Sequence, residues 1–344
     1  MKAIILVKPK QPELTVLPTP LIGEREVLIK VEIAGVCGSD IQKLFSSISP
    51  YSYPKTNILG HEAAGKVVEI GAAVTEFQPG ARVAIKPLIS CKQCVYCTEG
   101  REELCSNLQS IGKSRAGAFA EYIAVPSENV RYIPSNISYK AAALTDVVAV
   151  AIHAIHLAQS PRSMRVLILG DGAIALACAQ ILQIDNNSVT LIGKNKANLD
   201  LAKGLGIHVL QLGQKELENK PIYDVVFECV GKHQSDTINT AITQVKPGGK
   251  IIVLGVFAVG YIGQVEVRNL FYKEISLLGA NSYGIWDGVD EFDVALSLLS
   301  EGKLNPAAWI THQFKLEAVA DLMYSIEHKS ISKLVKAVFI PSEG

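Results

Sequence analysis

The sequence has no excess of charge of either sign. Its 344 residues contain 33 lysines and arginines and 33 aspartates and glutamates, so the formal net charge is zero. Proteins that hold nucleic acid or an anionic membrane by electrostatic attraction carry a basic patch or stripe, which makes their balance of charge positive. The even balance therefore argues against nucleic acid and against a membrane surface as partners.

The sequence also lacks a recognisable signal peptide and an uninterrupted membrane span. Residues 1–14 hold a short apolar run that lysines and a proline cut off, which predicts a strand. Residues 166–184 have the length of a span, but they carry Asp171 and two glycines, so they predict a buried strand, turn and helix. Without a secretory signal, the seven cysteines are expected to be thiols and metal ligands in a cytoplasmic protein.

Two kinds of pattern divide the chain. About the first 140 residues read as short Val/Ile-rich runs between Gly/Pro turns, which predicts a mostly β domain. From about residue 146 apolar strands alternate with helical patterns, which predicts a parallel sheet covered on both faces. We therefore expect an α/β fold with a β-rich domain (1–147), a doubly wound parallel-sheet domain (148–284) and a C-terminal segment that returns to the first domain (285–344).

A glycine-rich turn follows the first strand of the second domain. After the strand at 165–169 the chain reads Gly-Asp-Gly-Ala-Ile-Ala, a G-x-G-x-x-A pattern that opens a helix. Gly170 permits a tight turn, Gly172 lets a pyrophosphate approach the backbone, and Ala175 leaves room for packing of the helix on the strand. The pattern predicts a Rossmann dinucleotide site whose binding residues include Gly170, Gly172, Ala173 and Ile174.

The end of the second strand bears on which dinucleotide binds. An NAD site places an acid about 20 residues after the glycines, on the ribose 2′-hydroxyl. Here the chain has Gly193, Lys194, Asn195 and Lys196, and no acid. A glycine leaves room for a 2′-phosphate and two lysines could bind it, so the sequence favours NADP over NAD. The alternative is that the lysines are only the solvated start of a helix and that the protein discriminates little between NADP and NAD.

Four of the seven cysteines lie within one loop. Cys91, Cys94, Cys97 and Cys105 have the spacing C-x2-C-x2-C-x7-C. Four thiolates complete a tetrahedral zinc site and leave no position for a substrate. A redox C-x-x-C normally opens a helix of a thioredoxin-like unit, and no such unit is predicted here. The loop is therefore expected to hold a structural zinc ion, and the chemistry is expected elsewhere.

Two other segments carry groups that could bind metal. Cys37 stands among small residues with Ser39 and Asp40 just after it, and His61 and Glu62 lie in a glycine-framed turn. Taken singly, Cys37 could be a buried apolar residue and His61 a hydrogen-bonded turn histidine. Their order along the chain decides between these interpretations.

Together these motifs resemble a known family. Cys37-Gly-Ser-Asp, Gly-His61-Glu62, the four-cysteine loop and the Rossmann glycines follow one another as in zinc-dependent medium-chain dehydrogenases/reductases, the alcohol dehydrogenase family. The likeness is strongest to the sorbitol, threonine and galactitol-1-phosphate dehydrogenase branch. It implies a GroES-like catalytic domain with both zinc sites, a Rossmann domain, two zinc ions per chain, NADP or NAD, and a homodimer or homotetramer.

The resemblance also assigns roles to the residues around the second metal site. Cys37 and His61 would be ligands of a catalytic zinc ion, with Glu62 close behind the metal and able to exchange with water. Asp40 would accept a hydrogen bond from His61 and fix its tautomer. Ser39 would hydrogen-bond the reacting oxygen and start a proton relay.

Several carried-over positions depart from the family pattern or have an alternative. Asp146 stands where the branch has a glutamate ligand, and it could equally be the N-cap of the helix that follows. Gln42 stands where some alcohol dehydrogenases have a histidine that passes the relayed proton to solvent. Cys229 and Val230 should flank the ribose and nicotinamide, or belong to the strand core. Lys336 should reach the pyrophosphate, or be a surface lysine.

The sequence thus predicts an NADP-preferring, zinc-dependent dehydrogenase that acts on an alcohol or polyol and its carbonyl product. One alternative is an NAD-dependent polyol or sugar-phosphate dehydrogenase. A second is a zinc-free quinone or enoyl reductase, against which Cys37, His61 and the four cysteines all count. A third is a non-catalytic nucleotide sensor, favoured only by the unusual Asp146. Residues 41–54 are expected to line the substrate pocket.

Overall fold

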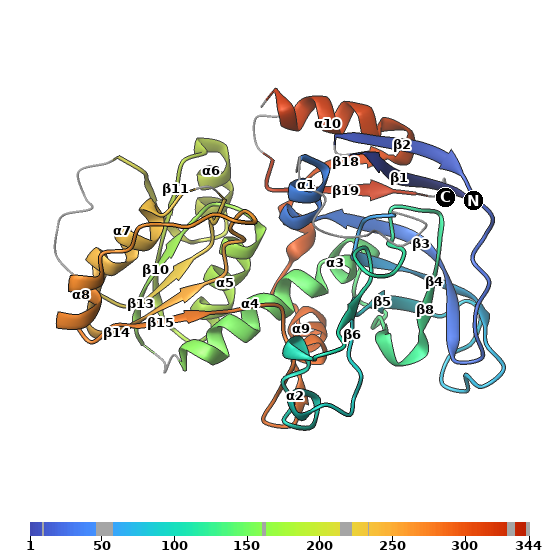
Figure 1. The fold of residues 1–344 in the computed structure, drawn as a ribbon, viewed down its shortest axis with the longest axis horizontal. Helices are drawn as coiled ribbons and strands as arrows, with labels where there is room; N and C mark the ends of the chain where they lie inside the picture. Colours follow the sequence, from blue (N-terminus) through green and yellow to red (C-terminus); the bar gives the residue numbers. More distant parts are fainter. Residues whose placement is uncertain are drawn as a thin grey trace. The chain divides into compact units, whose positions relative to one another are not determined.

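The computed structural model describes residues 1–8, 10–45, 58–159, 163–213, 222–232, 234–328 and 334–341. The chain divides into two compact units, residues 1–146 with 287–344, and residues 147–286 (Figure 1). Within the described ranges, none of the helices combines the length and the hydropathy that crossing a membrane requires.

The unit of residues 147–286 is built on a parallel sheet with strand order β12-β11-β10-β13-β14-β15. The order reverses between β10 and β13, and in open α/β sheets ligands bind at the carboxyl ends of the strands at such a reversal. The strands are β10 (Arg165–Leu169), β11 (Ser188–Gly193), β12 (His208–Gln211), β13 (Tyr223–Glu228), β14 (Val245–Val253) and β15 (Ser276–Gly279).

Helices cover this sheet on both faces. Four successive residues of β10, Val166 to Leu169, are buried, and because neighbouring side chains of a strand point to opposite faces, both faces must be covered. The expected doubly wound fold is confirmed. The helices that follow one another along this part of the chain are α4 (Thr145–Ala158), α5 (Ala173–Ile184), α6 (Lys196–Gly204), α7 (Asp236–Gln244) and α8 (Val267–Tyr272).

The other unit is built on a mostly antiparallel sheet with the order β18-β19-β3-β4-β5-β9, and β8 also pairs with β3. Its last strand along the chain, β19, pairs antiparallel with β3, so the end of the chain completes a sheet that its beginning started. The strands are β3 (Glu26–Val36), β4 (Glu62–Ile70), β5 (Arg82–Ile85), β8 (Tyr122–Pro126), β9 (Val130–Tyr132), β18 (Ile310–Lys315) and β19 (Lys336–Ile340).

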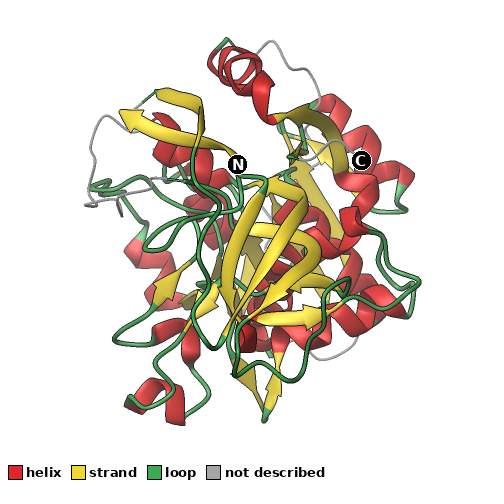
Figure 2. Ribbon diagram, turned by 90° about the vertical axis from the view of Figure 1, so that its right-hand side faces the viewer, coloured by secondary structure: helices red, strands yellow, loops and turns green. Residues whose placement is uncertain are grey.

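Shorter elements complete the chain, and Figure 2 shows all helices and strands by type. The short strands are β1 (Lys2–Lys8), β2 (Gln11–Val16), β6 (Leu88–Ile89), β7 (Gln109–Ser110), β16 (Ile285–Trp286) and β17 (Val289–Asp290). The remaining helices are α1 (Gly38–Phe45), α2 (Val95–Thr98), α3 (Tyr139–Ala143), α9 (Glu291–Ser300) and α10 (Val319–Glu327), with 3-10 turns η1 (Glu102–Leu104), η2 (Ser127–Asn129), η3 (Pro306–Trp309) and η4 (Leu316–Ala318).

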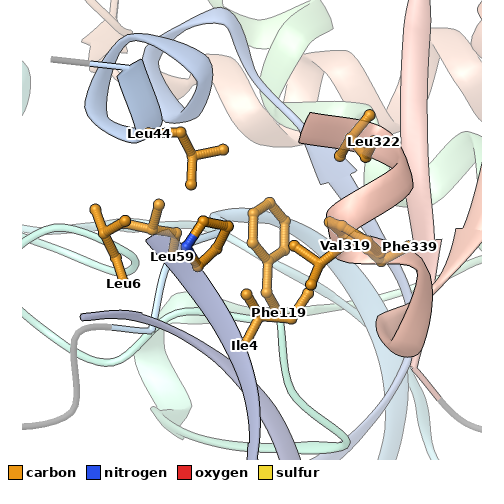
Figure 3. Close-up of a pocket in the computed structure, with 9 residues that line it drawn as sticks. Ile4, Leu6, Leu44, Leu59, Phe119, Val319, Leu322 and Phe339 are labelled. Carbon is orange, nitrogen blue, oxygen red and sulfur yellow. The ribbon is translucent and has the colours of Figure 1, made fainter. Parts of the chain in front are cut away.

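The core of the unit of residues 1–146 with 287–344 contains an apolar pocket (Figure 3). The rings of Phe119 and Phe339 meet edge to face there, with centroids 4.9 Å apart. The pocket has no polar side chain that could bind a substrate group, so it belongs to the packing of the core. It is lined by Ile4, Leu6, Pro12, Leu44, Leu59, Phe119, Val319, Leu322 and Phe339.

Candidate metal and dinucleotide sites

Strand pairing brings three of the predicted metal ligands together. Cys37 follows the end of β3, His61 precedes β4, and Glu62 is the first residue of β4. The two strands are antiparallel, with Gly35 opposite Glu62, so the end of β3 meets the start of β4. The sulfur of Cys37, a ring nitrogen of His61 and a carboxylate oxygen of Glu62 all lie within 4.8 Å of one another.

Gly60 sets the turn that presents His61. Its φ angle of +90° lies in the left-handed region, which side-chain-bearing residues rarely adopt. The neighbouring loop fixes the turn, because the backbone N–H groups of Ala118 and Phe119 donate to the carbonyl oxygens of Gly60 and Leu59, at 2.9 Å each. A side chain at position 60 would also collide with the ring of Phe119.

Asp40 supports both the cysteine and the histidine. It is fully buried in the first turn of α1, and its Oδ2 accepts a hydrogen bond from the backbone N–H of Cys37 at 3.0 Å. Its Oδ1 lies 3.5 Å from Nδ1 of His61, the arrangement that orients a metal-binding imidazole. Ser39, its neighbour in α1, is partly exposed.

The charges of this cluster shift its protonation. Burial lowers the pKa of His61, but Asp40 and Cys37 outweigh burial and raise that pKa well above its usual value. Burial raises the pKa of Asp40, and the charges of His61 and Lys43 reverse this and lower it. The raised pKa favours the charged imidazolium form, so a metal ion that binds a ring nitrogen must displace its proton.

Lys336 joins this cluster from the last strand of the chain. Its Nζ donates to Oε1 of Glu62 at 2.7 Å and to the carbonyl oxygen of Val36 at 3.2 Å. Lys336 is 5% exposed and Glu62 is 1% exposed, so the ion pair is buried. The alternative of a surface lysine is wrong, because pairing of β19 with β3 turns this side chain inward.

The donor set of the cluster suits zinc. A thiolate, an imidazole and a carboxylate are the groups that zinc takes in catalytic sites. Lys336 satisfies one oxygen of Glu62, whereas the other oxygen, Oε2, is buried without a hydrogen-bond partner in the described structure. A metal ion between Cys37, His61 and Glu62 would satisfy that oxygen.

Asp146 lies outside this cluster as far as the described residues show. It is 8% exposed and stands in the first turn of α4, which begins one residue earlier at Thr145. Helix α4 therefore begins just before Asp146 rather than just after it, and the role of Asp146 as a zinc ligand stays a prediction. Of residues 41–54, which were expected to line the substrate pocket, residues 46–54 lie outside the described structure.

The four cysteines of the loop form a second cluster of ligand atoms within 4.8 Å of one another. The sulfur of Cys97 lies 3.9 Å from that of Cys91 and 3.5 Å from that of Cys94. A tetrahedron of thiolates with Zn–S bonds of about 2.3 Å has sulfur atoms about 3.8 Å apart, so this spacing fits zinc. Backbone N–H groups of Cys97 and Ser106 lower the pKa of Cys94 to about 6, whereas burial and the neighbouring thiols raise the pKa of Cys97 to about 12, so a metal ion that binds both must displace a proton from Cys97.

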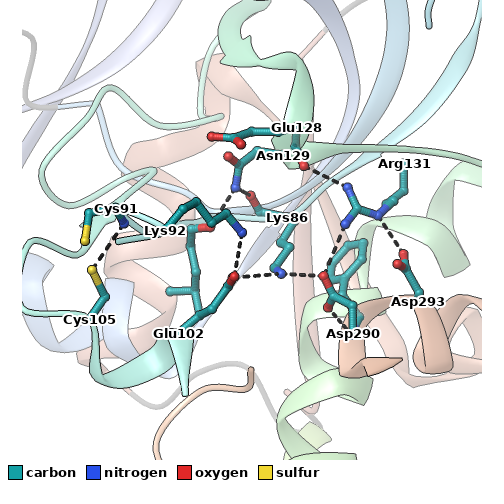
Figure 4. Close-up of polar contacts among 12 residues, drawn as sticks. Lys86, Cys91, Lys92, Glu102, Cys105, Glu128, Asn129, Arg131, Asp290 and Asp293 are labelled. Carbon is teal, nitrogen blue, oxygen red and sulfur yellow. Dashed lines mark hydrogen bonds and ion pairs between the residues drawn. The ribbon is translucent and has the colours of Figure 1, made fainter. Parts of the chain in front are cut away.

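A chain of ion pairs ties the cysteine loop to residues 287–344 (Figure 4). Glu102, between the third and fourth cysteines, accepts a hydrogen bond from Lys92 at 2.6 Å and lies 3.6 Å from Nζ of the buried Lys86. Lys86 in turn donates to Asp290 at 2.5 Å, and Arg131 lies 3.1 Å from the same carboxylate. The ion pairs therefore connect the cysteine loop to Asp290, the residue that caps α9.

Replacing Cys94 by serine should remove one zinc ion per chain and lower the free energy of unfolding by about 3 kcal/mol or more, because metal binding here is coupled to folding. The kcat should change little although the protein is less stable, because four thiolates leave no coordination position of the zinc ion open to a substrate. Zinc analysis, thermal unfolding and kcat on the same preparation measure this. Cys178→Ser, a cysteine outside both clusters, is the matched control and should keep its zinc. A variant that keeps both zinc ions would contradict the assignment.

The glycine turn after β10 has the geometry of a dinucleotide site. Gly170 has a φ angle of +126°, and Gly172 is the N-cap of the 12-residue helix α5. A Cβ on Gly172 would meet no atom within 4 Å, so a ligand can approach the helix N-terminus there. The backbone N–H of Cys229 donates to the carbonyl oxygen of Leu169 at 2.8 Å, which places the two strand ends side by side at the reversal of strand order.

Glu228, the last residue of β13, fixes the loop that follows this strand, next to the end of β10. It is fully buried, and its Oε1 accepts hydrogen bonds from the backbone N–H groups of Val230 and Gly231, at 3.0 Å each, and from Thr237 Oγ1 at 2.7 Å. The predicted binding residues Cys229 and Val230 thus belong to a loop that a buried carboxylate shapes. A carboxylate at the end of an apolar strand was the only sequence signal for this role.

The structure after β11 is compatible with both interpretations of Lys194 and Lys196, as ligands of a 2′-phosphate or as the solvated start of a helix. Asn195 caps α6 by accepting a hydrogen bond from the N–H of Ala197 at 3.0 Å. Lys194 and Lys196, on either side of it, are exposed. They therefore start a solvated helix and are also available to an anion.

Comparisons with known proteins agree with this geometry. Residues 23–135 match the alcohol dehydrogenase GroES-like domain, and residues 172–301 match the zinc-binding dehydrogenase domain. Sorbitol dehydrogenase of Halalkalibacterium halodurans is 32% identical over 87% of this chain and 88% of its own. A zinc-binding dehydrogenase of Sinorhizobium meliloti 1021, bound to NADP, has a TM-score of 0.89 at 28% identity over 99% of both chains. The alcohol dehydrogenase rspB of Escherichia coli CFT073, complexed with NADH, has a TM-score of 0.88 at 26% identity over 99% of both chains.

Proposed function

The chain belongs to the zinc-dependent medium-chain alcohol dehydrogenase family, and we propose that it transfers hydride between NADP(H) and a polyol, sugar alcohol or secondary alcohol. The family, the reaction class and the combination of a GroES-like with a Rossmann domain, all expected from the sequence, are confirmed. The cofactor preference and the substrate class are our inference. We assign the catalytic role to the unit of residues 1–146 with 287–344 and dinucleotide binding to residues 147–286.

The observation that carries the proposal is the cluster of Cys37, His61 and Glu62. Zinc held by such donors supplies Lewis-acid polarisation of an alcohol or carbonyl oxygen. Cys37 and His61 would hold the metal, and Asp40 keeps the imidazole oriented. Glu62 is fixed by Lys336 through one oxygen and keeps the other for the metal.

We propose that the hydroxyl of Ser39 is the first group to accept the proton that leaves the alcohol. Ser39 is partly exposed at the start of α1, two residues after Cys37, so its hydroxyl can pass a proton on. Gln42 lies one turn further along the same helix, and an amide side chain cannot act as a base. We therefore propose that water rather than residue 42 receives the proton from Ser39.

The proposed preference for NADP(H) rests on residues 193–196. The end of β11 has a glycine where an NAD site has an acid, and Lys194 and Lys196 beside it are exposed. The two relatives of known structure carry NADP in one case and NADH in the other, so family membership alone does not choose. NAD is the second candidate cofactor for this reason. A zinc-free reductase has no support, because both cysteine-containing clusters assemble.

A substrate panel run with both cofactors tests the proposal. Polyols, sugar alcohols, sugar phosphates and secondary alcohols should be assayed for oxidation, and the matching carbonyl compounds for reduction, with zinc content measured alongside. We expect turnover of at least one alcohol class and a higher kcat/KM with NADP(H) than with NAD(H). Absence of turnover from protein that is loaded with two zinc ions would contradict the enzyme assignment, and a higher kcat/KM with NAD(H) would contradict the cofactor assignment alone.

We also propose a homodimer or homotetramer assembled through the edge of the parallel sheet. Strand β15 ends that sheet and exposes 40% of Leu277, and Phe271 and Tyr272 of α8, just before it, are 73% and 66% exposed. Exposed strand edges with apolar side chains commonly pair with a second copy. Sedimentation should give a multiple of the 37.0 kDa chain mass, and a monomer would contradict this proposal. The proposed cytoplasmic location rests on the seven unpaired cysteine thiols and is tested by cell fractionation.

A further inference from the structure

A carboxylate lies at the end of β11, where the sequence itself has none. It belongs to Asp171, the second residue of the glycine turn after β10. Its Oδ2 accepts hydrogen bonds from the backbone N–H groups of Lys194, at 2.8 Å, and Asn195, at 2.7 Å. Nδ2 of Asn198 donates to the carbonyl oxygen of Asp171 at 3.1 Å and lies 3.5 Å from its Oδ1. Asp171 is therefore held against the connection between the second strand and its helix.

Gly193 is the position whose side-chain space this carboxylate fills. A Cβ on Gly193 would lie 2.5 Å from both Cβ and Oδ2 of Asp171, closer than side chains pack. Any side chain at position 193 would therefore collide with Asp171. The acid that an NAD site has at the end of its second strand is supplied here from the glycine turn, and residue 193 has to be a glycine because Asp171 is present.

The surroundings of Asp171 are positively charged. The nine-residue helix α6 begins at Lys196, and the positive end of its dipole favours a carboxylate nearby. Asp171 also occupies two backbone N–H groups, of Lys194 and Asn195, that could otherwise bind an anion. Its charge opposes a phosphate, whereas its Oδ1 keeps lone pairs that can accept a hydrogen bond from a hydroxyl.

We propose that Asp171 is a specificity-determining residue for the dinucleotide, and that it weakens binding of a 2′-phosphate relative to a free 2′-hydroxyl. The inference rests on the proposed function, because it takes the adenosine ribose to bind at the end of β11. Lys194 and Lys196 attract the 2′-phosphate and Asp171 repels it. The proposed preference for NADP(H) is then the balance of two lysines against one carboxylate.

The test replaces Asp171 by asparagine, whose amide oxygen can still accept from the N–H groups of Lys194 and Asn195 while the charge is lost. Calorimetry measures Kd for adenosine 2′,5′-bisphosphate and for 5′-AMP, and then for NADPH and NADH, so that no turnover is needed. We expect the affinity for adenosine 2′,5′-bisphosphate relative to 5′-AMP, and for NADPH relative to NADH, to rise by about tenfold. Lys194→Ala should move the same ratio in the opposite direction.

Asp200→Asn is the matched control, because it removes the same charge from an exposed position on α6, the helix that follows β11. It should change the ratio by less than about threefold, since solvent screens exposed charges. An unchanged ratio in folded Asp171→Asn protein overturns the inference about Asp171 alone. If the natural protein binds neither dinucleotide, the proposed function fails and this inference fails with it. If Asp171→Asn does not fold, Asp171→Ser gives the same measurement with a smaller hydrogen-bond acceptor.

Discussion

Replacing Cys37 by serine should lower kcat by at least about a thousandfold, which corresponds to about 4 kcal/mol of transition-state stabilisation, while dinucleotide binding stays close to that of the natural protein. Cys37 supplies the only sulfur of the cluster with His61 and Glu62, and a serine hydroxyl is a much poorer zinc ligand than a thiolate. The glycine turn at 170–174 and the strand ends at 193–195 and 229–230 belong to the other unit of the chain, so their geometry should change little when this side chain is replaced. Steady-state kinetics, zinc analysis and calorimetry with NADPH measure the three quantities.

The comparison with Cys94→Ser makes this result specific. Both variants exchange one zinc-binding thiol for a hydroxyl, and each should lose about one zinc ion per chain. Cys37→Ser should lose turnover and keep most of its stability, whereas Cys94→Ser should lose stability and keep more of its chemical step. Retained turnover in Cys37→Ser protein would remove this cluster from the mechanism. Equal loss of stability in the two variants would contradict the distinction between an open and a closed metal site.

Replacing Lys336 by methionine should lower the free energy of unfolding by about 3–5 kcal/mol, because the carboxylate of Glu62 would remain buried without its cation. Lys336 is the cation that the structure places on Glu62, at 2.7 Å, and both side chains are almost fully buried. Chemical unfolding followed by circular dichroism measures the loss. Zinc analysis of the same variant shows whether Glu62, once released from Lys336, changes metal occupancy.

A double-mutant cycle separates the ion pair from simple loss of packing. Glu62→Gln in the Lys336→Met background removes the unpaired charge, so the double variant should be more stable than Lys336→Met alone. A double variant that is less stable than Lys336→Met would contradict the importance of the pair. Free energies should be compared in apo protein, because a metal bound to Glu62 would compensate for the lost cation.

The direction in which the pKa of Lys336 is shifted determines how the stability from the Lys336–Glu62 pair depends on pH. Burial lowers the pKa of Lys336, but Glu62 and Cys37 outweigh burial and raise it above its ordinary value. A raised pKa contributes stability that is fully present below the unfolded value of about 10.4 and is lost as the pH rises through the folded value. The stability that the charge of Lys336 contributes should therefore still be present at about pH 9, and unfolding measured above about pH 10.4 should show its loss.

Much of the architecture could be predicted because its signals are local. The strand expected at 165–169 and the helix expected to end at 184 agree with β10 and α5, since a continuous apolar run, two glycines and helical periodicity occur within a few residues. The start of β14 at Val245 could not be predicted in this way, because β14 pairs with β13 across an irregular register that local patterns do not show. The helix α1 was not predicted, because its apolar residues Ile41, Leu44 and Phe45 have helical spacing over too few residues to stand out.

The sequence by itself determined the metal chemistry and the nucleotide fold of this protein, because donor types, cysteine spacing and the glycine turn are properties of short segments. Only the tertiary structure decided which charges meet. It placed Lys336 on Glu62, 274 residues away along the chain, because β19 pairs with β3. It also placed Asp171 beside Gly193, because β10 and β11 are neighbours in a parallel sheet. Strand pairing across long separations sets where a side chain points, and no local pattern carries that information.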